Sequence, residues 1–305
     1  MKLNLILSKT NWTSFHQVAF TDLTSEHFNI VFIEDQLPEK ANSLLVSNLT
    51  TDCWYQELHQ QGYPLIIDLL WGVDELDLPN SFRLINPNWF WYHEALLYHR
   101  KGYDQYTPNR QYLKKALMPM GLRKESHDLL FDRVGEYLDE FIYSYIERLG
   151  KYLPNDAPTN FYGSTMQNQR YFNSEWYDQT YFSLVSETLV DDKKILHVTE
   201  KSFKPIAFYH PFMIFGQSGL LDYLRNQGFE TYDNLFDESY DTCHDKLIRV
   251  KKIVDNIKLF KYVEYDKLTI EKTLHNHNLF FSFQLIKDRI KNEIVDPIID
   301  FFESR

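Results

Sequence analysis

The sequence has few cysteines and glycines and lacks any long apolar run. Cys53 and Cys243 are the only two cysteines among 305 residues, and their wide separation favours free thiols in a reducing compartment over a disulfide or a metal site. Ten glycines are too few for collagen and make a glycine-rich phosphate loop a poor prediction. The longest apolar run, 65–72, contains Asp68 and is too short to span a membrane. We therefore expect a cytoplasmic protein without a membrane span.

Basic residues are also in deficit. The chain has 32 Lys and Arg against 43 Asp and Glu, a formal net charge of −11, which repels a phosphate backbone and makes nucleic acid an unlikely partner. Local basic clusters remain at 114–124 and at Lys201 and Lys204, and a phosphorylated small molecule needs no more than such a cluster. The length and the 44% hydrophobic content indicate two domains, each with its own core.

Short apolar runs alternate with helical patterns in the first half, which predicts βαβ units and a largely parallel sheet. We expect strands at 2–8, 27–35, 63–72 and 81–87 and a helix at 51–61. Residues 109–121 resemble a basic connection, and apolar residues at helical spacing predict one long helix over 126–152. The proline-containing segment 153–160 then separates an acceptor-side Rossmann-like domain, 1–152, from a donor-binding domain, 153–305.

The second half repeats this alternation and ends in helices. We expect strands at 159–164, 181–187 and 210–216, and helices at 199–209, 218–228, 239–257 and 269–305, the last broken at Pro297. The fold class is therefore α/β, with C-terminal helices.

The most informative segment is 181–224. A buried strand ends in Glu187-Thr188, and Thr199, Glu200 and Lys201 then begin a helix. In open α/β sheets ligands bind outside the carboxyl ends of the strands, where a helix N-terminus offers N–H groups and a positive dipole end to a diphosphate. Lys201 adds a full charge, Glu200 can accept two hydrogen bonds from ribose hydroxyls, and Thr199 can cap the helix. The segment predicts a nucleotide-diphosphate site, and an ordinary solvent-exposed helix start is the alternative.

The same residues resemble the donor-binding signature of the α1,3-fucosyltransferase family. That signature reads F-x-x-x-x-E-N, then D-Y-I-T-E-K, then a proline-led strand ending in glycine. Here it is matched from Phe182 to Glu187, by Val198 to Lys201, and from Pro211 to Gly216. Phe161-Tyr162-Gly163 resembles the aromatic-glycine turn that opens the family's donor domain. The stretch EKSFKP and residues 236–241 are also similar to phage and marine bacterial glycosyltransferase-like proteins.

The resemblance implies a GT-B fold, with two Rossmann-like domains facing across a cleft. It also implies sugar transfer from a nucleotide-diphosphate sugar, such as GDP-fucose, to a hydroxyl acceptor such as a glycan, without a metal or other cofactor. It makes Glu200 the ribose ligand and Lys201 the diphosphate ligand, and it places Glu187 at the donor site. Arg123, with Lys124 beside it, best matches an arginine that helps to neutralise the diphosphate in the family.

Three positions depart from the family pattern. Thr188 stands where the family has Asn, His197 where it has Tyr, and Lys204-Pro205 where it has an Arg-Asn-like pair. Since these positions lie near the base or the sugar in the family, the donor need not be GDP-fucose.

The resemblance does not identify the general base, which in the family is a carboxylate of the acceptor domain. Asn86-Pro87 lacks the acid of the family's Glu-Ser-Pro, and Asp68 and Glu94 are the candidates that remain. Two other functions therefore stay open. One is a phage enzyme that glycosylates modified DNA bases, and the other is a non-catalytic nucleotide-binding or interaction protein that kept the donor fold and lost the base.

Metal-ligand patterns are weak in this sequence. Asp191-Asp192 could hold a divalent ion as the DxD motif of the other glycosyltransferase fold does, but the lysines that follow favour a solvated turn. The pairs His93 and His99, and His275 and His277, do not share one helical face. We therefore expect no metal site.

Overall fold

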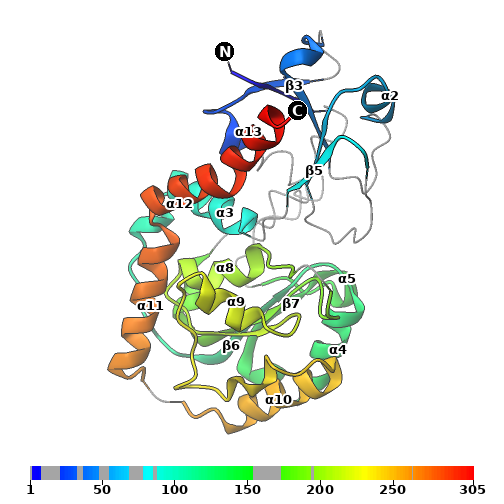
Figure 1. The fold of residues 1–305 in the computed structure, drawn as a ribbon. Coiled ribbons are helices and arrows are strands. Elements are labelled where there is room, and N and C mark those ends of the chain that lie inside the picture. The colour runs from blue at the N-terminus through cyan, green and yellow to red at the C-terminus, as the bar shows by residue number, and fades with distance from the viewer. Residues whose placement is uncertain are drawn as a thin grey trace. The chain divides into compact units, whose positions relative to one another are not determined.

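The structure is a computed structural model that describes residues 2–7, 21–32, 37–47, 55–68, 78–84, 88–153, 173–193, 196–262 and 264–305. It divides into two compact units (Figure 1). Unit 1 comprises 1–93 and 282–305, and unit 2 comprises 94–281. The predicted division at 152/153 differs from this one, because the strands within 114–145 pair with strands of the donor segment rather than with those of unit 1.

Unit 1 contains a parallel sheet of strand order β2-β1-β3-β4-β5. The strands are β1 (Asn4–Leu7), β2 (Asn29–Phe32), β3 (Ser43–Ser47), β4 (Leu65–Asp68) and β5 (Ser81–Leu84). Its helices are η2 (Lys40–Asn42), α2 (Tyr55–Gln60), the first part of α3 (Trp89–Arg100), α12 (Phe283–Ile290), the π-helix η7 (Lys291–Val295) and α13 (Asp296–Glu303). The C-terminal helices return to this sheet, where Phe301 of α13 stacks on Phe82 of β5 at 5.5 Å between ring centroids.

Unit 2 contains a second parallel sheet, of order β7-β6-β8-β9. The strands are β6 (Lys114–Met120), β7 (Phe141–Tyr145), β8 (Thr180–Ser186) and β9 (Phe212–Phe215). The helices are η3 (Tyr103–Gln105), α4 (Glu125–Arg133), η4 (Gly135–Glu140), α5 (Ile146–Leu149), α7 (Ser174–Asp178), α8 (Glu200–Ala207), α9 (Leu220–Asn226), η6 (Glu238–Tyr240), α10 (Lys246–Leu259) and α11 (Lys267–Phe280). Every residue of β8 is buried, as expected for an inner strand of a parallel sheet with helices on both faces.

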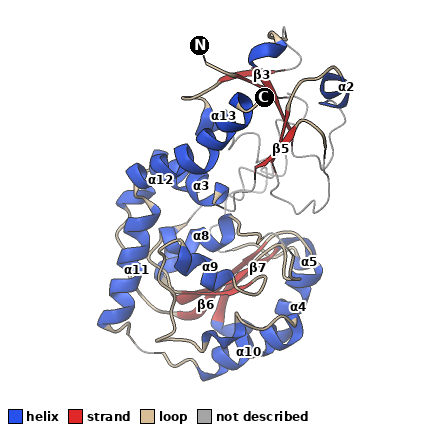
Figure 2. Ribbon diagram, in the orientation of Figure 1, coloured by secondary structure: helices blue, strands red, loops and turns tan. Residues whose placement is uncertain are grey.

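The helices of unit 2 lie on both sides of its sheet, with α8 on one side and α4 and α10 on the other (Figures 1 and 2). Because parallel strands run in one direction, the turns that leave β6, β8 and β9 gather at one edge. These turns lead into α4, α8 and α9, respectively.

The predicted helix over 126–152 is wrong. Helix α4 ends at Arg133, a 3-10 helix follows, and residues 141–145 form strand β7. The sequence of β7, FIYSY, is rich in aromatic and β-branched residues, which favour a strand once a neighbouring strand is available. The apolar residues of α4 and β7 together have the spacing of one long helix, which is why the sequence predicted a single element.

Residues 114–120 form strand β6, so the basic connection expected at 109–121 is also wrong. Lys115 is buried there, and its ammonium pairs with Glu140 at 2.9 Å. The predicted helix break at Pro297 falls instead at 281–282, between α11 and α12. Pro297 lies in the first turn of α13, where the missing N–H costs little. The expected strand 159–164 lies outside the described residues.

The predicted α/β class with two Rossmann-like domains, as in a GT-B fold, is confirmed by the two parallel sheets and their flanking helices. In the part of the chain that the structure describes, every helix is too short or too polar to cross a membrane.

Candidate functional site

The candidate site lies at the carboxyl edge of the unit 2 sheet, where β8 ends and α8 begins. Glu187 follows β8 directly and is fully buried. Its Oε1 accepts hydrogen bonds from the Thr199 N–H at 3.0 Å and the Ser202 hydroxyl at 2.6 Å. Its Oε2 accepts from the Thr199 hydroxyl at 2.6 Å and the Thr188 N–H at 3.3 Å. The carboxylate thus joins the end of β8 to the N-terminus of α8, and four protein donors occupy its oxygens.

Thr199 is the N-cap of α8, as the sequence predicts. Its hydroxyl oxygen accepts from the Lys201 N–H at 3.4 Å, and its backbone has the extended geometry of a cap residue. Glu200 and Lys201 therefore occupy the first turn, where a carboxylate is favoured by the helix dipole.

Glu200 and Lys201 form an ion pair with 2.9 Å between Oε1 and Nζ. Glu200 is almost completely buried, and burial alone raises a carboxyl pKa. The charges of Lys201 and Lys204 outweigh burial and lower the pKa of Glu200 to about 2. Burial lowers the pKa of Lys201, but the carboxylates of Glu200 and Glu187 outweigh it and raise that pKa above the usual value. Both groups are ionised near neutral pH.

A second lysine approaches from the turn between β6 and α4. The Nζ of Lys124 lies 3.2 Å from Thr188 Oγ1, and the Nζ of Lys201 lies 3.4 Å from the same atom. No carboxylate of the described residues lies within ion-pair distance of the Lys124 ammonium. Burial and then the neighbouring charge of Lys201 lower the pKa of Lys124. Two ammonium groups thus converge on one hydroxyl at the end of β8.

Arg123, the neighbouring candidate, points elsewhere. Its side chain is 61% exposed, and its Nε pairs with Asp128 at 2.9 Å. Its backbone N–H donates to Glu147 at 2.6 Å. The fold therefore brings Lys124, rather than Arg123, beside Lys201.

The two candidate bases occupy different units. Asp68 is the last residue of β4 in unit 1, and its side chain lies outside the described part of the structure. Glu94 belongs to the part of α3 in unit 2 and is 1% exposed. Burial and then the charge of Glu94 raise the pKa of Tyr98, and Glu94 also lies within electrostatic reach of Lys201.

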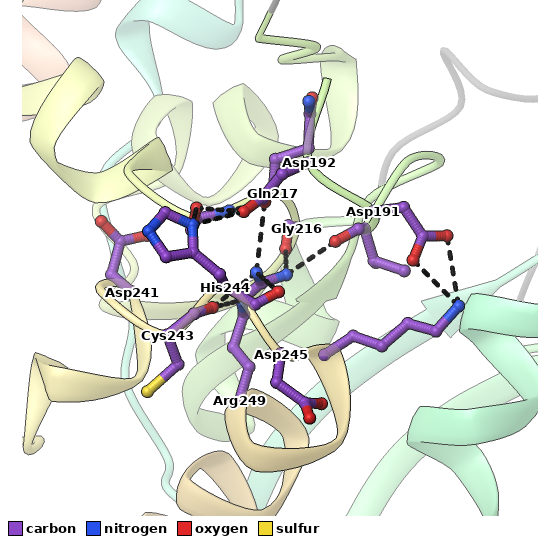
Figure 3. Close-up of polar contacts among 12 residues, drawn as sticks. Asp191, Asp192, Gly216, Gln217, Asp241, Cys243, His244, Asp245 and Arg249 are labelled. Atoms are coloured by element: carbon purple, nitrogen blue, oxygen red, sulfur yellow. Dashed lines mark hydrogen bonds and ion pairs between the residues drawn. The ribbon is translucent and has the colours of Figure 1, made fainter. Parts of the chain in front are cut away.

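The loop between β8 and α8 is held in place by α10 (Figure 3). Arg249 of α10 is 1% exposed and its guanidinium donates to the main-chain carbonyls of Val190, Gly216, Cys243 and His244. It also pairs with the Asp192 carboxylate at 3.3 Å. Arginine cannot lose its charge in a protein. These hydrogen bonds and the ion pair with Asp192 are therefore what permits the burial of the guanidinium.

Asp192 extends this network to the turn after β9. Its carboxylate accepts from the Ser218 hydroxyl at 2.7 Å and contacts His244 Nδ1 at 2.7 Å. Despite partial burial, the Ser218 hydrogen bonds, His244 and Arg249 lower the Asp192 pKa to about 2. Asp191 pairs with Lys246 of α10 at 3.0 Å. Asp191 and Asp192 are exposed in a loop, as the solvated turn favoured from the sequence predicts, and their carboxylates also anchor this loop to α10.

His197 has a related role further along the loop. It is buried, and its N–H donates to Gln217 Oε1 at 2.7 Å, which ties the segment before α8 to the turn after β9. Gly163 lies outside the described residues. In the described part of the chain, no group of three or more His, Cys, Asp or Glu could hold a metal ion.

The sequence reasoning missed Arg249. The signal was present, because Arg249 belongs to the buried stripe of α10, which consists of Arg249, Val250, Ile253, Asn256 and Ile257. A lone arginine within an apolar stripe at helical spacing indicates a buried, fully bonded guanidinium.

No protein-family model matches the sequence, and no curated protein sequence matches it significantly. Solved structures similar to this chain are crystal structures of α1,3-fucosyltransferase, the family that the sequence motif resembles. One has a TM-score of 0.45 with 13% identity, covering 94% of this chain and 90% of that chain. A complex with GDP-fucose has a TM-score of 0.42 with 13% identity, covering 92% and 90%. A complex with GDP has a TM-score of 0.37 with 13% identity, covering 94% and 90%.

Proposed function

We propose that this chain is a glycosyltransferase that binds a nucleotide-diphosphate sugar at the carboxyl edge of the unit 2 sheet and transfers the sugar to a hydroxyl acceptor. The observation that carries the proposal is the convergence of the Lys124 and Lys201 ammonium groups on Thr188 Oγ1, at 3.2 Å and 3.4 Å. Like charges this close repel each other, and an anion between them would remove the repulsion. A diphosphate is such an anion, and the N-termini of α4 and α8 add N–H groups and positive dipole ends.

The residues at this edge suggest a role for each part of the donor. Lys124 and Lys201 would bind the diphosphate and stabilise it as it departs, which is a way to balance charge without a metal. Glu200, ionised near neutral pH, would accept hydrogen bonds from the ribose hydroxyls. The donor would be GDP-fucose or a related nucleotide sugar, and the acceptor a glycan hydroxyl. Asp68 and Glu94 remain the candidates for the carboxylate that removes the acceptor proton.

One observation favours a second function, nucleotide binding without sugar transfer. Glu187 and Glu94 are both at most 1% exposed, and the Glu187 oxygens are occupied by protein donors. A general base must reach the hydroxyl that it deprotonates. If no carboxylate does so, the chain would bind a nucleotide and transfer nothing.

A thermal-shift panel tests the binding site first. The wild type, Lys124→Met, Lys201→Met and Glu200→Gln are each melted with GDP, UDP, ADP, CDP and GDP-fucose. A ligand at a hundred times its dissociation constant adds about 2.7 kcal/mol of stability. Lys251→Met is the matched control, because Lys251 is 72% exposed and, among the described residues, pairs only with Asp255 one turn further along the same helix. We expect one nucleotide to stabilise the wild type and the control strongly and the three site variants weakly.

Transfer is tested separately, by the release of the nucleoside diphosphate from the stabilising nucleotide sugar with and without a glycan acceptor. Release that depends on Lys201 supports the glycosyltransferase. Binding without release supports the second function. If no nucleotide raises the melting temperature, or if the lysine variants respond as the control does, the site assignment is wrong.

A further inference from the structure

His127 is a buried histidine beside the two lysines. It is the third residue of α4 and is 2% exposed. Its Nδ1 lies 2.7 Å from the Leu122 carbonyl oxygen, so Nδ1 carries the proton and donates. Leu122 belongs to the turn that carries Lys124, and the imidazole therefore helps to hold this turn. The other ring nitrogen, Nε2, is buried and has no hydrogen-bond partner among the described residues.

Two of the positive charges at the site act on this ring. Lys124 on the adjacent turn and Lys201 on α8 both lower the pKa of His127, after burial as the main cause. From β7, the Tyr145 ring lies edge-on at 6.5 Å between centroids, and its hydroxyl donates to Asp128. From α10, Lys246 pairs with Glu125 in the first turn of α4. The main-chain groups of Leu122 and Ser186 favour the protonated ring.

Burial and the charges of Lys124 and Lys201 therefore favour the neutral form of His127. An anion placed between the lysines would cancel their field at the ring and leave the favourable contributions of the Leu122 and Ser186 main chain. We propose that His127 takes up a proton when a phosphate group binds between Lys124 and Lys201. This inference rests on the proposed function, because it assumes that an anion occupies that position.

Proton uptake at His127 also suits the proposed reaction. When the bond between the anomeric carbon and the phosphate oxygen breaks, the electron pair stays on that oxygen, and the acceptor oxygen forms the new bond to carbon. The acceptor proton leaves to a base or to solvent, and the nucleoside diphosphate carries one further negative charge. A proton taken from solvent onto His127 Nε2 would balance this charge without a metal. His127 acts here through the lysines, as a positioning and charge-balancing residue.

Nuclear magnetic resonance of protein with ¹⁵N-labelled histidine tests the inference directly. The ring signals are titrated from pH 5 to 8 in sodium chloride, in sodium sulfate at equal ionic strength, and with GDP-fucose. Sulfate is used because it stays a dianion across this range. His127→Gln assigns the His127 signal, since glutamine can still donate to Leu122. His210 is the internal control, because both of its ring nitrogens are within hydrogen-bond distance of protein atoms in the core.

We expect sulfate and GDP-fucose to raise the His127 titration midpoint by about one pH unit, the effect of a nearby opposite charge, and to leave His210 unchanged. Three outcomes would overturn the inference. If either anion raises the melting temperature but the His127 midpoint stays fixed, proton uptake is wrong and the proposed function stands. If neither anion changes the melt or the midpoint, the inference fails together with the proposed anion site. If His210 shifts as much as His127, the effect is general and does not arise at the lysine pair.

Discussion

Glu187 provides the sharpest test of what holds the candidate site together. The sequence motif places this residue at the donor site, whereas the structure has its carboxylate accept four hydrogen bonds from the protein at full burial. Glu187→Gln keeps the shape of the side chain but removes the charge and turns one oxygen into a donor. Hydrogen bonds to a charged group contribute about 1.5–3 kcal/mol each, against about 0.5–1.5 for neutral pairs. Four weakened bonds, offset by the easier burial of an amide, give an expected loss of about 3 kcal/mol in the free energy of unfolding.

Urea denaturation followed by tryptophan fluorescence measures this loss. With a slope of about 2–3 kcal/mol per molar urea, the midpoint should fall by roughly 1–1.5 M. Glu271→Gln is the control, because its side chain is 58% exposed and pairs only within its own helix; it should change stability by less than about 0.5 kcal/mol. The structural role of Glu187 in joining β8 to α8 is refuted if Glu187→Gln unfolds at the wild-type midpoint while its affinity for the stabilising nucleotide falls tenfold or more. Glu187 would then be a ligand-binding residue.

Three further predictions concern the surroundings of the site. Arg249→Lys should lower the free energy of unfolding by about 3–5 kcal/mol, the usual cost of breaking a buried charge network; urea denaturation measures it, and a loss under about 1 kcal/mol would show that the guanidinium is not needed to hold the loop. Burial and the charge of Arg110 hold the pKa of His210 well below its usual value, so its contribution to stability is complete above about pH 6.5 and is lost as the pH falls. Melting temperatures from pH 5 to 8 should therefore decline on the acid side less steeply in His210→Gln than in the wild type, and parallel curves would contradict this. Finally, sugar transfer should keep its rate in EDTA and gain nothing from added Mg²⁺, and a rate that disappears in EDTA and returns with Mg²⁺ would overturn metal-independent charge balance.

Short sequence patterns predicted the strands and the helix start that are determined by neighbouring residues in the sequence. Strands β1, β4 and β8 are short runs of β-branched and apolar residues. The first two lie within predicted strands, and β8 begins and ends one residue before the predicted strand 181–187. The start of α8 was predicted because Thr199 is a preferred N-cap residue. Strand β6 was missed because lysine and proline are rare in inner strands, and here Lys114 is its first residue and Pro119 its last but one. Its partners, which make the strand stable, are remote in sequence.

The lysine pair depends on strand order, which no local pattern contains. Strand β6 lies between β7 and β8 in the sheet, and this order brings the turn after β6 beside the end of β8. Lys124 and Thr188, separated by 64 positions in the sequence, meet there at 3.2 Å. The resemblance placed a basic residue at 123–124 but could not decide which side chain points inward. Arg123 is drawn away by Asp128, and that contact depends on the helical spacing of α4.

The charges at this edge also argue for the proton at His127. At the ends of β8 and α8 the carboxylates of Glu187 and Glu200 face the ammonium groups of Lys124, Lys201 and Lys204. A bound diphosphate would add negative charge to a partly buried site, and one more would develop as the sugar leaves. Helix N-termini supply only partial positive charges. In many phosphate sites a metal ion supplies the positive charge that is still needed. A neutral histidine that becomes protonated when the anion arrives would supply positive charge only when it is needed. It would avoid the repulsion that a further permanent cation beside Lys124 and Lys201 would cause before the anion binds.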